Sequence, residues 1–168
     1  MARPCDEEAL VALQKAIQLE QEGQAFYRRA AERTANLKGA ATFRSLAEDE
    51  VLHEKILRRQ MEALTGGEGW CVLDEVGEAE GDLPATLFPR GEEGLKKAVS
   101  PEASDLDALL FALQIESESY NFYREQALRT EDPAGRRMYQ HLARAEQGHF
   151  DLLMLNYEHL TTTGMWPS

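Results

Sequence analysis

The sequence contains one segment twice, and this duplication constrains the fold more than any other feature. Residues 16–57 and 112–153 align without a gap at an offset of 96, and sixteen of the 42 aligned positions are identical. Apolar residues recur at helical spacing through both copies, and each copy is interrupted once, shortly before Gly39 or Gly135. Each copy therefore predicts a pair of helices, and the whole chain is predicted to be an all-α, antiparallel four-helix bundle.

The predicted helices cover about 6–35, 39–64, 105–130 and 133–162. Asp6 is expected to cap the first helix, and Ser104 with Asp107 resembles a capping box at the start of the third. Asp132 followed by Pro133 is typical of an N-cap and first helical position. These N-terminal signals set the predicted starts of the helices. We treat residues 1–168 as a single bundle domain.

Residues 65–104 differ from the helical segments, because they contain prolines and glycines and show no sustained period. A link of this length is expected to run along the bundle, as a long crossover between the second and third helices. Apolar residues are expected to hold it to the bundle surface: Trp70, Leu73, Leu83, Leu87 and Phe88. Trp166, near the C-terminus, is expected to dock on the bundle or on a second subunit.

Each copy carries the residues for one half of a two-metal site. The first helix of each copy has a glutamate on its apolar face, and a Glu-x-x-His pair begins 30 residues later. On a helix this spacing brings both side chains to one face, a turn apart. The predicted metal ligands are Glu20, Glu50, His53, Glu116, Glu146 and His149.

Burial is the reason to expect metal at these residues. Glu20 and Glu116 directly follow the core residues Leu19 and Ile115, and an unpaired carboxylate is costly to bury. Nearby basic residues do not share the same helix face, so bound cations are the simplest compensation. Carboxylate and imidazole ligands suit iron or manganese, and zinc can occupy such a site. The alternative is a bundle that keeps these residues and binds nothing.

Other polar residues have weaker signals. Tyr27 and Tyr123 lie two turns after the lone glutamates on the same face, where each is either a hydrogen-bond donor and proton or electron relay, or an ordinary core aromatic. Asp49 could orient a ligand histidine, but its counterpart in the second copy is Ala145, so such support would be one-sided. Glu22 and Glu118 are expected to be solvated or salt-bridged to Arg28 or Arg124, and His141 and His159 are expected at the surface.

Composition limits the partners and the compartment. Thirty acidic and 18 basic residues give a formal net charge of −12, which argues against nucleic acid and anionic membranes as partners. No stretch reaches the ~20 apolar residues of a membrane span, and the first residues lack the apolar core of a signal peptide. Cys5 and Cys71 fit a reducing compartment in which both thiols stay free. We therefore expect a cytoplasmic protein.

These motifs resemble the rubrerythrin-type branch of the ferritin-like superfamily. The resemblance is carried by Glu20, Glu50-Val51-Leu52-His53, Glu116 and Glu146-Gln147-Gly148-His149. It implies a ferritin-like bundle with a non-haem centre of two iron ions, which reacts with hydrogen peroxide or dioxygen. It also implies assembly as a homodimer or a larger oligomer.

The sequence departs from rubrerythrins in two respects. Rubrerythrins carry a rubredoxin domain with four cysteines, whereas this sequence has no Cys-x-x-Cys pair, so electrons are expected from a separate donor protein such as a rubredoxin. Rubrerythrins also usually have a second glutamate three residues after the third-helix glutamate, where this chain has Ser119. The expected centre is therefore the symmetric type with four glutamates and two histidines, similar to that of bacterioferritin.

Three functions are compatible with these residues. The first is an oxidoreductase that reduces peroxide or dioxygen, and the second is ferritin-like iron storage or delivery in a cage of many subunits. The third is a scaffold without redox chemistry. Nothing in the sequence demands a cage, and the crossover and tail are more typical of a dimer, so the oxidoreductase is the preferred prediction.

Overall fold

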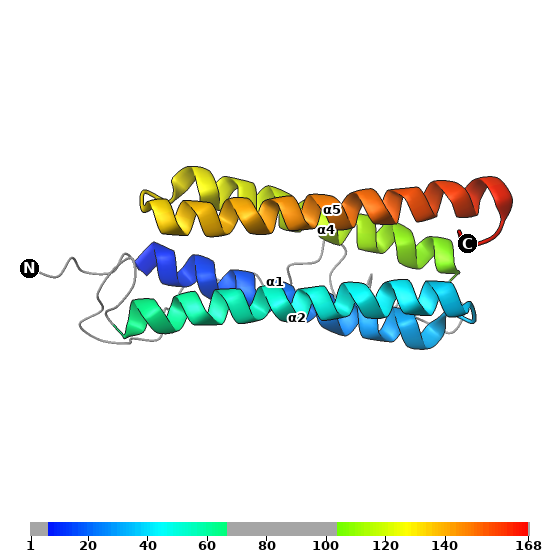
Figure 1. Cartoon of the computed structure of the whole chain (residues 1–168), viewed down its shortest axis with the longest axis horizontal. Coiled ribbons are helices and arrows are strands. Elements are labelled where there is room, and N and C mark those ends of the chain that lie inside the picture. Colours follow the sequence, from blue (N-terminus) through cyan, green and yellow to red (C-terminus); the bar gives the residue numbers. More distant parts are fainter. Residues whose placement is uncertain (1–6, 67–103, 168) are drawn as a thin grey trace, which may run out of the picture.

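The computed structural model describes residues 7–66 and 104–167. These residues form four α-helices and no strand: α1 (Glu7–Arg33), α2 (Leu37–Thr65), α4 (Asp105–Arg129) and α5 (Pro133–Thr163). α1 and α2 form one antiparallel hairpin, α4 and α5 form a second, and the two hairpins lie side by side in an elongated bundle (Figure 1). The predicted all-α, antiparallel four-helix bundle is confirmed.

Side-chain caps explain where three of the helices begin. Asn36 caps α2 by accepting hydrogen bonds from two backbone N–H groups, so this helix begins before the predicted start at residue 39. Ser104 and Asp107 form the expected capping box of α4. Asp132 caps α5 ahead of Pro133, also as expected. The prediction missed the cap at Asn36 because it placed the start of the helix at a glycine.

Trp166 docks on the bundle, which is one of the two places predicted for it. Its ring is 6% exposed and meets Phe43 edge-on at 5.7 Å between ring centroids. Its Nε1 donates a hydrogen bond of 2.8 Å to Asp105 Oδ2. A Cβ atom at Gly39 would lie 2.7 Å from the indole, so glycine at this position lets the ring approach α2. The contact joins the two hairpins at one end of the bundle.

The apolar core consists of two clusters that lie on opposite sides of the bundle's mid-length. One contains Phe26, Phe43 and Phe111, and the other contains Leu13 and Leu57 with their neighbours. On every helix, the glutamate predicted as a ligand lies between the members of the first cluster and those of the second. The predicted ligands therefore lie between two apolar clusters along the bundle axis.

The ends of the two hairpins are placed as the predicted long crossover requires. α2 ends and α4 begins at opposite ends of the bundle (Figure 1), which a long crossover requires. The crossover itself lies almost wholly outside the described residues. The same is true of the individual predictions for Asp6, Cys5, Cys71, Trp70, Leu73, Leu83, Leu87 and Phe88. Among residues 7–66 and 104–167, no helix has the length and hydrophobicity needed to cross a membrane.

Candidate metal centre

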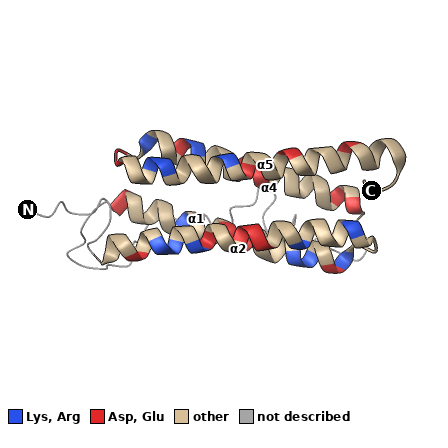
Figure 2. Cartoon of the chain, in the orientation of Figure 1, with Lys and Arg blue, Asp and Glu red and all other residues tan. Residues whose placement is uncertain are grey.

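The structure brings all six predicted ligands together at mid-length of the bundle, where acidic residues gather on α2 (Figure 2). α1 and α4 each contribute the lone glutamate, and α2 and α5 each contribute a Glu-x-x-His pair. All six side chains are buried, with exposed fractions between 0 and 7%: Glu20, Glu50, His53, Glu116, Glu146 and His149. The six residues therefore lie together, as the spacing argument requires, and their role as metal ligands stays a prediction.

The six residues form two overlapping ligand sets. Glu20 and His53 belong to one set, Glu116 and His149 belong to the other, and Glu50 and Glu146 are common to both. Within each set of four, the ligand atoms lie within 4.8 Å of one another. The carboxylates common to both sets are therefore those of the two Glu-x-x-His pairs.

Both histidines turn Nδ1 toward the carboxylates. Nδ1 of His53 lies 3.0 Å from Glu146 and 3.5 Å from Glu20. Nδ1 of His149 lies 3.0 Å from Glu50 and 3.4 Å from Glu116. The closest carboxylate to each histidine thus comes from the opposite hairpin. The two rings stack with their centroids 5.5 Å apart.

The two tyrosines hydrogen-bond to the lone glutamates across the hairpins. The hydroxyl of Tyr27 donates to Glu116, and the hydroxyl of Tyr123 donates to Glu20. Burial, and next the nearby glutamates, raise the pKa of both phenols well above their ordinary value. Both hydroxyls therefore keep their protons at neutral pH. The hydrogen bond between tyrosine and glutamate is one of the two alternatives that the sequence left open, and the relay role stays a prediction.

Asp49 holds one of the two histidines from outside the cluster. Its Oδ2 lies 3.0 Å from Nε2 of His149, and its side chain is partly exposed. The prediction that Asp49 orients a histidine agrees with this contact, and the contact is one-sided, as expected.

Crowding of buried carboxylates sets the electrostatics of the centre. Burial raises the pKa of Glu20, Glu50 and Glu116, and the charge of Glu146 raises each of them further. Burial would also raise the pKa of Glu146, but hydrogen bonds to Glu116 and both histidines outweigh it and lower that pKa. Burial lowers the pKa of His53, yet hydrogen bonds to Glu146 and Glu20 outweigh it and raise the pKa to about 10. The centre therefore retains protons that cations would displace.

The residues present fit two divalent cations. Five buried atoms of the cluster make no hydrogen bond among the described residues, and all but Glu116 Oε2 have only ion-pair contacts between histidine and carboxylate: Glu20 Oε2, Glu50 Oε1, Glu116 Oε2, Glu146 Oε2 and His149 Nδ1. Buried polar atoms without a hydrogen bond are rare in protein interiors, because they are costly to bury. Each glutamate has one such oxygen, which metal coordination would satisfy. Four carboxylates and two divalent ions also carry equal and opposite charge.

Two residues beside the centre were missed by the sequence argument. A Cβ atom at Gly23 would lie 3.1 Å from Glu50 Oε2, so the glycine leaves room for a shared carboxylate. Gln24 Nε2 donates to the backbone oxygen of Glu50 at 3.3 Å and to Glu54 at 2.8 Å. Neither residue recurs in the second copy, where Ser119 and a tyrosine take their places, so the repeat contains no signal for them.

The four polar residues expected outside the centre divide into two groups by their exposure. Glu118 and His141 are exposed, as predicted. Glu22 is partly buried and accepts a hydrogen bond from Gln18 Nε2 at 3.2 Å. His159 is also partly buried, and its Nδ1 lies 2.8 Å from a backbone oxygen of the C-terminal tail. None of the four belongs to either ligand set.

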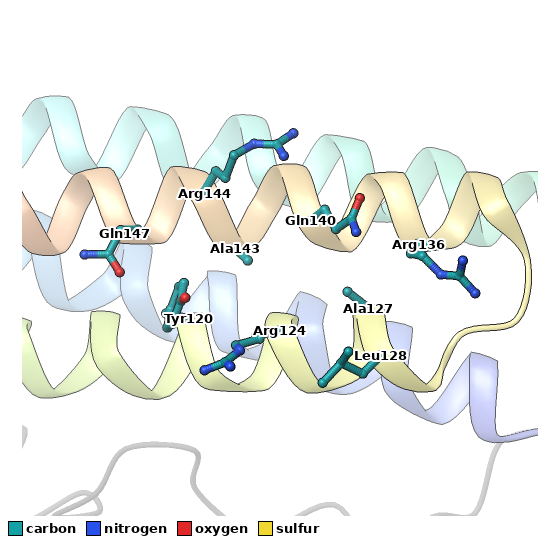
Figure 3. A pocket seen from close by; sticks show the side chains of 9 residues that line it. All are labelled: Tyr120, Arg124, Ala127, Leu128, Arg136, Gln140, Ala143, Arg144 and Gln147. Carbon is teal, nitrogen blue, oxygen red and sulfur yellow. The ribbon is translucent and has the colours of Figure 1, made fainter.

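A groove of about 620 Å³ lies between α4 and α5 and is separate from the ligand sets (Figure 3). It is lined by Tyr120, Arg124, Ala127, Leu128, Arg136, Gln140, Ala143, Arg144 and Gln147. None of these residues is one of the six predicted ligands. The six predicted ligands themselves are buried between the helices.

The bundle and its buried carboxylate–imidazole cluster together define a ferritin-like carboxylate protein, the class that binds two metal ions between its helices. The family model described as Rubrerythrin matches residues 12–157, and the chain belongs to the rubrerythrin family.

The fold also has a counterpart among solved structures. A hypothetical protein from Pyrococcus furiosus is 21% identical, with a TM-score of 0.66 over 92% of this chain and 91% of that chain. Similarity at this level of identity shows the shared fold alone. Among curated proteins there is no significant match.

Proposed function

We propose that the protein is a non-haem di-iron oxidoreductase that reduces hydrogen peroxide or dioxygen, with electrons from a separate donor protein. The observation that carries the proposal is the sharing of Glu50 and Glu146 by two ligand sets. Carboxylates common to both sets would hold two ions as a pair, and such a pair would supply redox chemistry toward one small oxidant. The complete set of proposed ligands is Glu20, Glu50, His53, Glu116, Glu146 and His149.

The chemistry follows from electron count and from the surrounding side chains. Two ferrous ions at these residues would supply two electrons, which together with two protons reduce one hydrogen peroxide to two waters. Tyr27 and Tyr123 hold the carboxylates of Glu116 and Glu20 in place. Because their hydroxyls remain protonated, we assign them the role of proton relay beside the centre. Apolar packing lies on both sides of the cluster and would keep bulk water away from it.

The proposed setting is a cytoplasmic homodimer that receives electrons from a small redox protein such as a rubredoxin. Iron supports this function and manganese could replace it, whereas zinc at the same ligands would be redox-inactive.

Stopped-flow mixing tests the reaction directly. Anaerobic protein loaded with two equivalents of ferrous iron is mixed with hydrogen peroxide or with dissolved oxygen, and visible absorption follows iron oxidation. We expect oxidation faster than that of free ferrous iron in the same buffer. The Glu50→Gln variant should lose this acceleration, and the Glu54→Gln variant, changed one turn away, should keep it. Wild-type oxidation no faster than that of free iron would contradict the proposal.

Light scattering tests the assembly. A dimer agrees with the proposal, whereas a closed shell of many subunits would favour ferritin-like iron storage at the same ligands.

A further inference from the structure

The two histidines of the centre are held differently. His149 directs Nδ1 into the carboxylates, while its Nε2 lies 3.0 Å from Asp49 Oδ2. His53 also directs Nδ1 inward, but the residue of α5 that corresponds to Asp49 is Ala145. Nε2 of His53 has no hydrogen-bond or ion-pair partner within 7–66 and 104–167. Among the described residues, one histidine therefore has a carboxylate behind it and the other does not.

The remaining ligands are matched between the two sets. Each set contains one lone glutamate, one histidine and both shared glutamates. Each lone glutamate also accepts a hydrogen bond from a tyrosine of the opposite hairpin. Because these contacts are equal in kind on both sides, they do not distinguish the two metal positions. The contact between Asp49 and His149 does.

A carboxylate behind a ligand histidine changes that histidine as a ligand. By accepting the Nε2 proton, Asp49 fixes the tautomer that leaves the Nδ1 lone pair free, and it holds the plane of the ring. It also makes Nδ1 more basic. Loss of such a partner typically weakens metal affinity by about 10–100-fold.

We propose that Asp49 makes the two metal positions inequivalent, so that the position with His149 binds more tightly and fills first. The expected difference in affinity is about 10–100-fold. This inference rests on the metal centre of the proposed function, but it concerns binding and not turnover. At one equivalent of metal, the ion should occupy the His149 position, and on treatment with a chelator the ion beside His53 should leave first.

The chain offers a matched pair of variants for this test. Asp49→Ala removes the carboxylate behind His149, and Ala145→Asp places one at the corresponding position beside His53. Glu48→Ala changes an exposed neighbour of Asp49 and is the control. Anaerobic titration of metal-free protein with cobalt(II), followed by visible absorption and calorimetry, measures both affinities without any turnover.

In the wild type we expect two binding steps separated by about 10–100-fold. Asp49→Ala should weaken the tighter step by a similar factor and spare the other. Ala145→Asp should strengthen the weaker step, and Glu48→Ala should change neither. Anomalous diffraction from wild-type crystals with one equivalent of cobalt should place the ion beside His149, and this measurement does not depend on a variant folding.

Different results would overturn different statements. Two ions bound with equal affinity, or an Asp49→Ala variant in which both steps weaken equally or stay unchanged, would overturn the inequivalence alone. One equivalent of cobalt found beside His53 would do the same. Wild-type protein that binds no metal at these ligands would overturn the proposed function itself.

Discussion

Replacement of Glu50 by glutamine should stabilise the metal-free protein and weaken its response to metal. Glu50 is 2% exposed and belongs to both ligand sets. Burial raises its pKa, and the charges of Glu146, Glu20 and Glu116 raise it further. The metal-free cluster contains four carboxylates and only two imidazoles, so ionisation of all four carboxylates would leave excess negative charge even with both histidines protonated. Glutamine has nearly the same shape as glutamate and cannot ionise, so it removes the cost of either charging Glu50 or holding a proton on it.

The effect of Glu50→Gln on the free energy of unfolding has opposite signs in the metal-free and the metal-bound protein. An uncompensated buried charge costs about 3–5 kcal/mol. Because the Glu50 carboxyl can take up a proton instead and the amide of glutamine remains polar, we expect the substitution to recover only part of this, about 1 kcal/mol, or a rise of roughly 2–4 °C in Tm for a chain of this length. A metal at 100 times its Kd should stabilise the wild type by about 2.7 kcal/mol per ion, or roughly 5–11 °C. The variant should lose most of that gain.

Differential scanning calorimetry with and without cobalt(II), at about pH 8, measures both effects. The control is Glu54→Gln, one turn along the same helix. The Glu54 carboxylate is paired with Arg58 at 2.6 Å, and despite some burial this pairing lowers its pKa. That variant should be slightly less stable without metal and should keep the full metal response. A Glu50→Gln protein that melts lower than the wild type without metal, or that keeps the full metal response, would refute the reasoning.

Three further predictions concern pH, the C-terminal tail and a glycine. The pKa of His53 is raised from 6.5 to about 10, so protonation of His53 stabilises the metal-free fold fully below pH 6.5, and this stabilisation is lost as pH rises to about 10. Urea unfolding across this pH range should show falling stability. A rise in stability would contradict the assignment. Trp166→Ala should cost about 3–5 kcal/mol by calorimetry, and Trp166→Phe should cost less; equal losses would argue against docking through ring packing. Gly23→Ala should weaken both cobalt affinities by displacing Glu50. Gly148→Ala, whose added Cβ meets nothing within 4 Å, should leave them unchanged.

Much of the centre could be predicted because its residues form a repeated local pattern. The Glu-x-x-His spacing places two side chains on one helix face wherever the helix lies, and the duplication supplies the second half. The same applies to the helix starts at Ser104 and Asp132, which depend on hydrogen bonds over two or three residues. The start of α2 was placed too late because Asn36 was not recognised as its cap.

Contacts between the hairpins could not be predicted in this way. Tyr27 lies two turns, or about 10 Å along the axis, from Glu20 on its own helix, and it bonds instead to Glu116, 89 residues away. Gly23 matters only because Glu50 packs against it from α2. Such pairings depend on the relative rotation and height of the helices, which no local pattern contains.

The sequence by itself determined the helices, the bundle and the six residues of the centre, because periodicity, capping and the duplication depend only on the spacing of residues along the chain. Only the tertiary structure decided that Glu50 and Glu146 are the shared carboxylates and that Asp49 lies behind His149 and not His53. Both depend on which side chains meet across the interface between the hairpins, and the packing of the two core clusters sets that geometry.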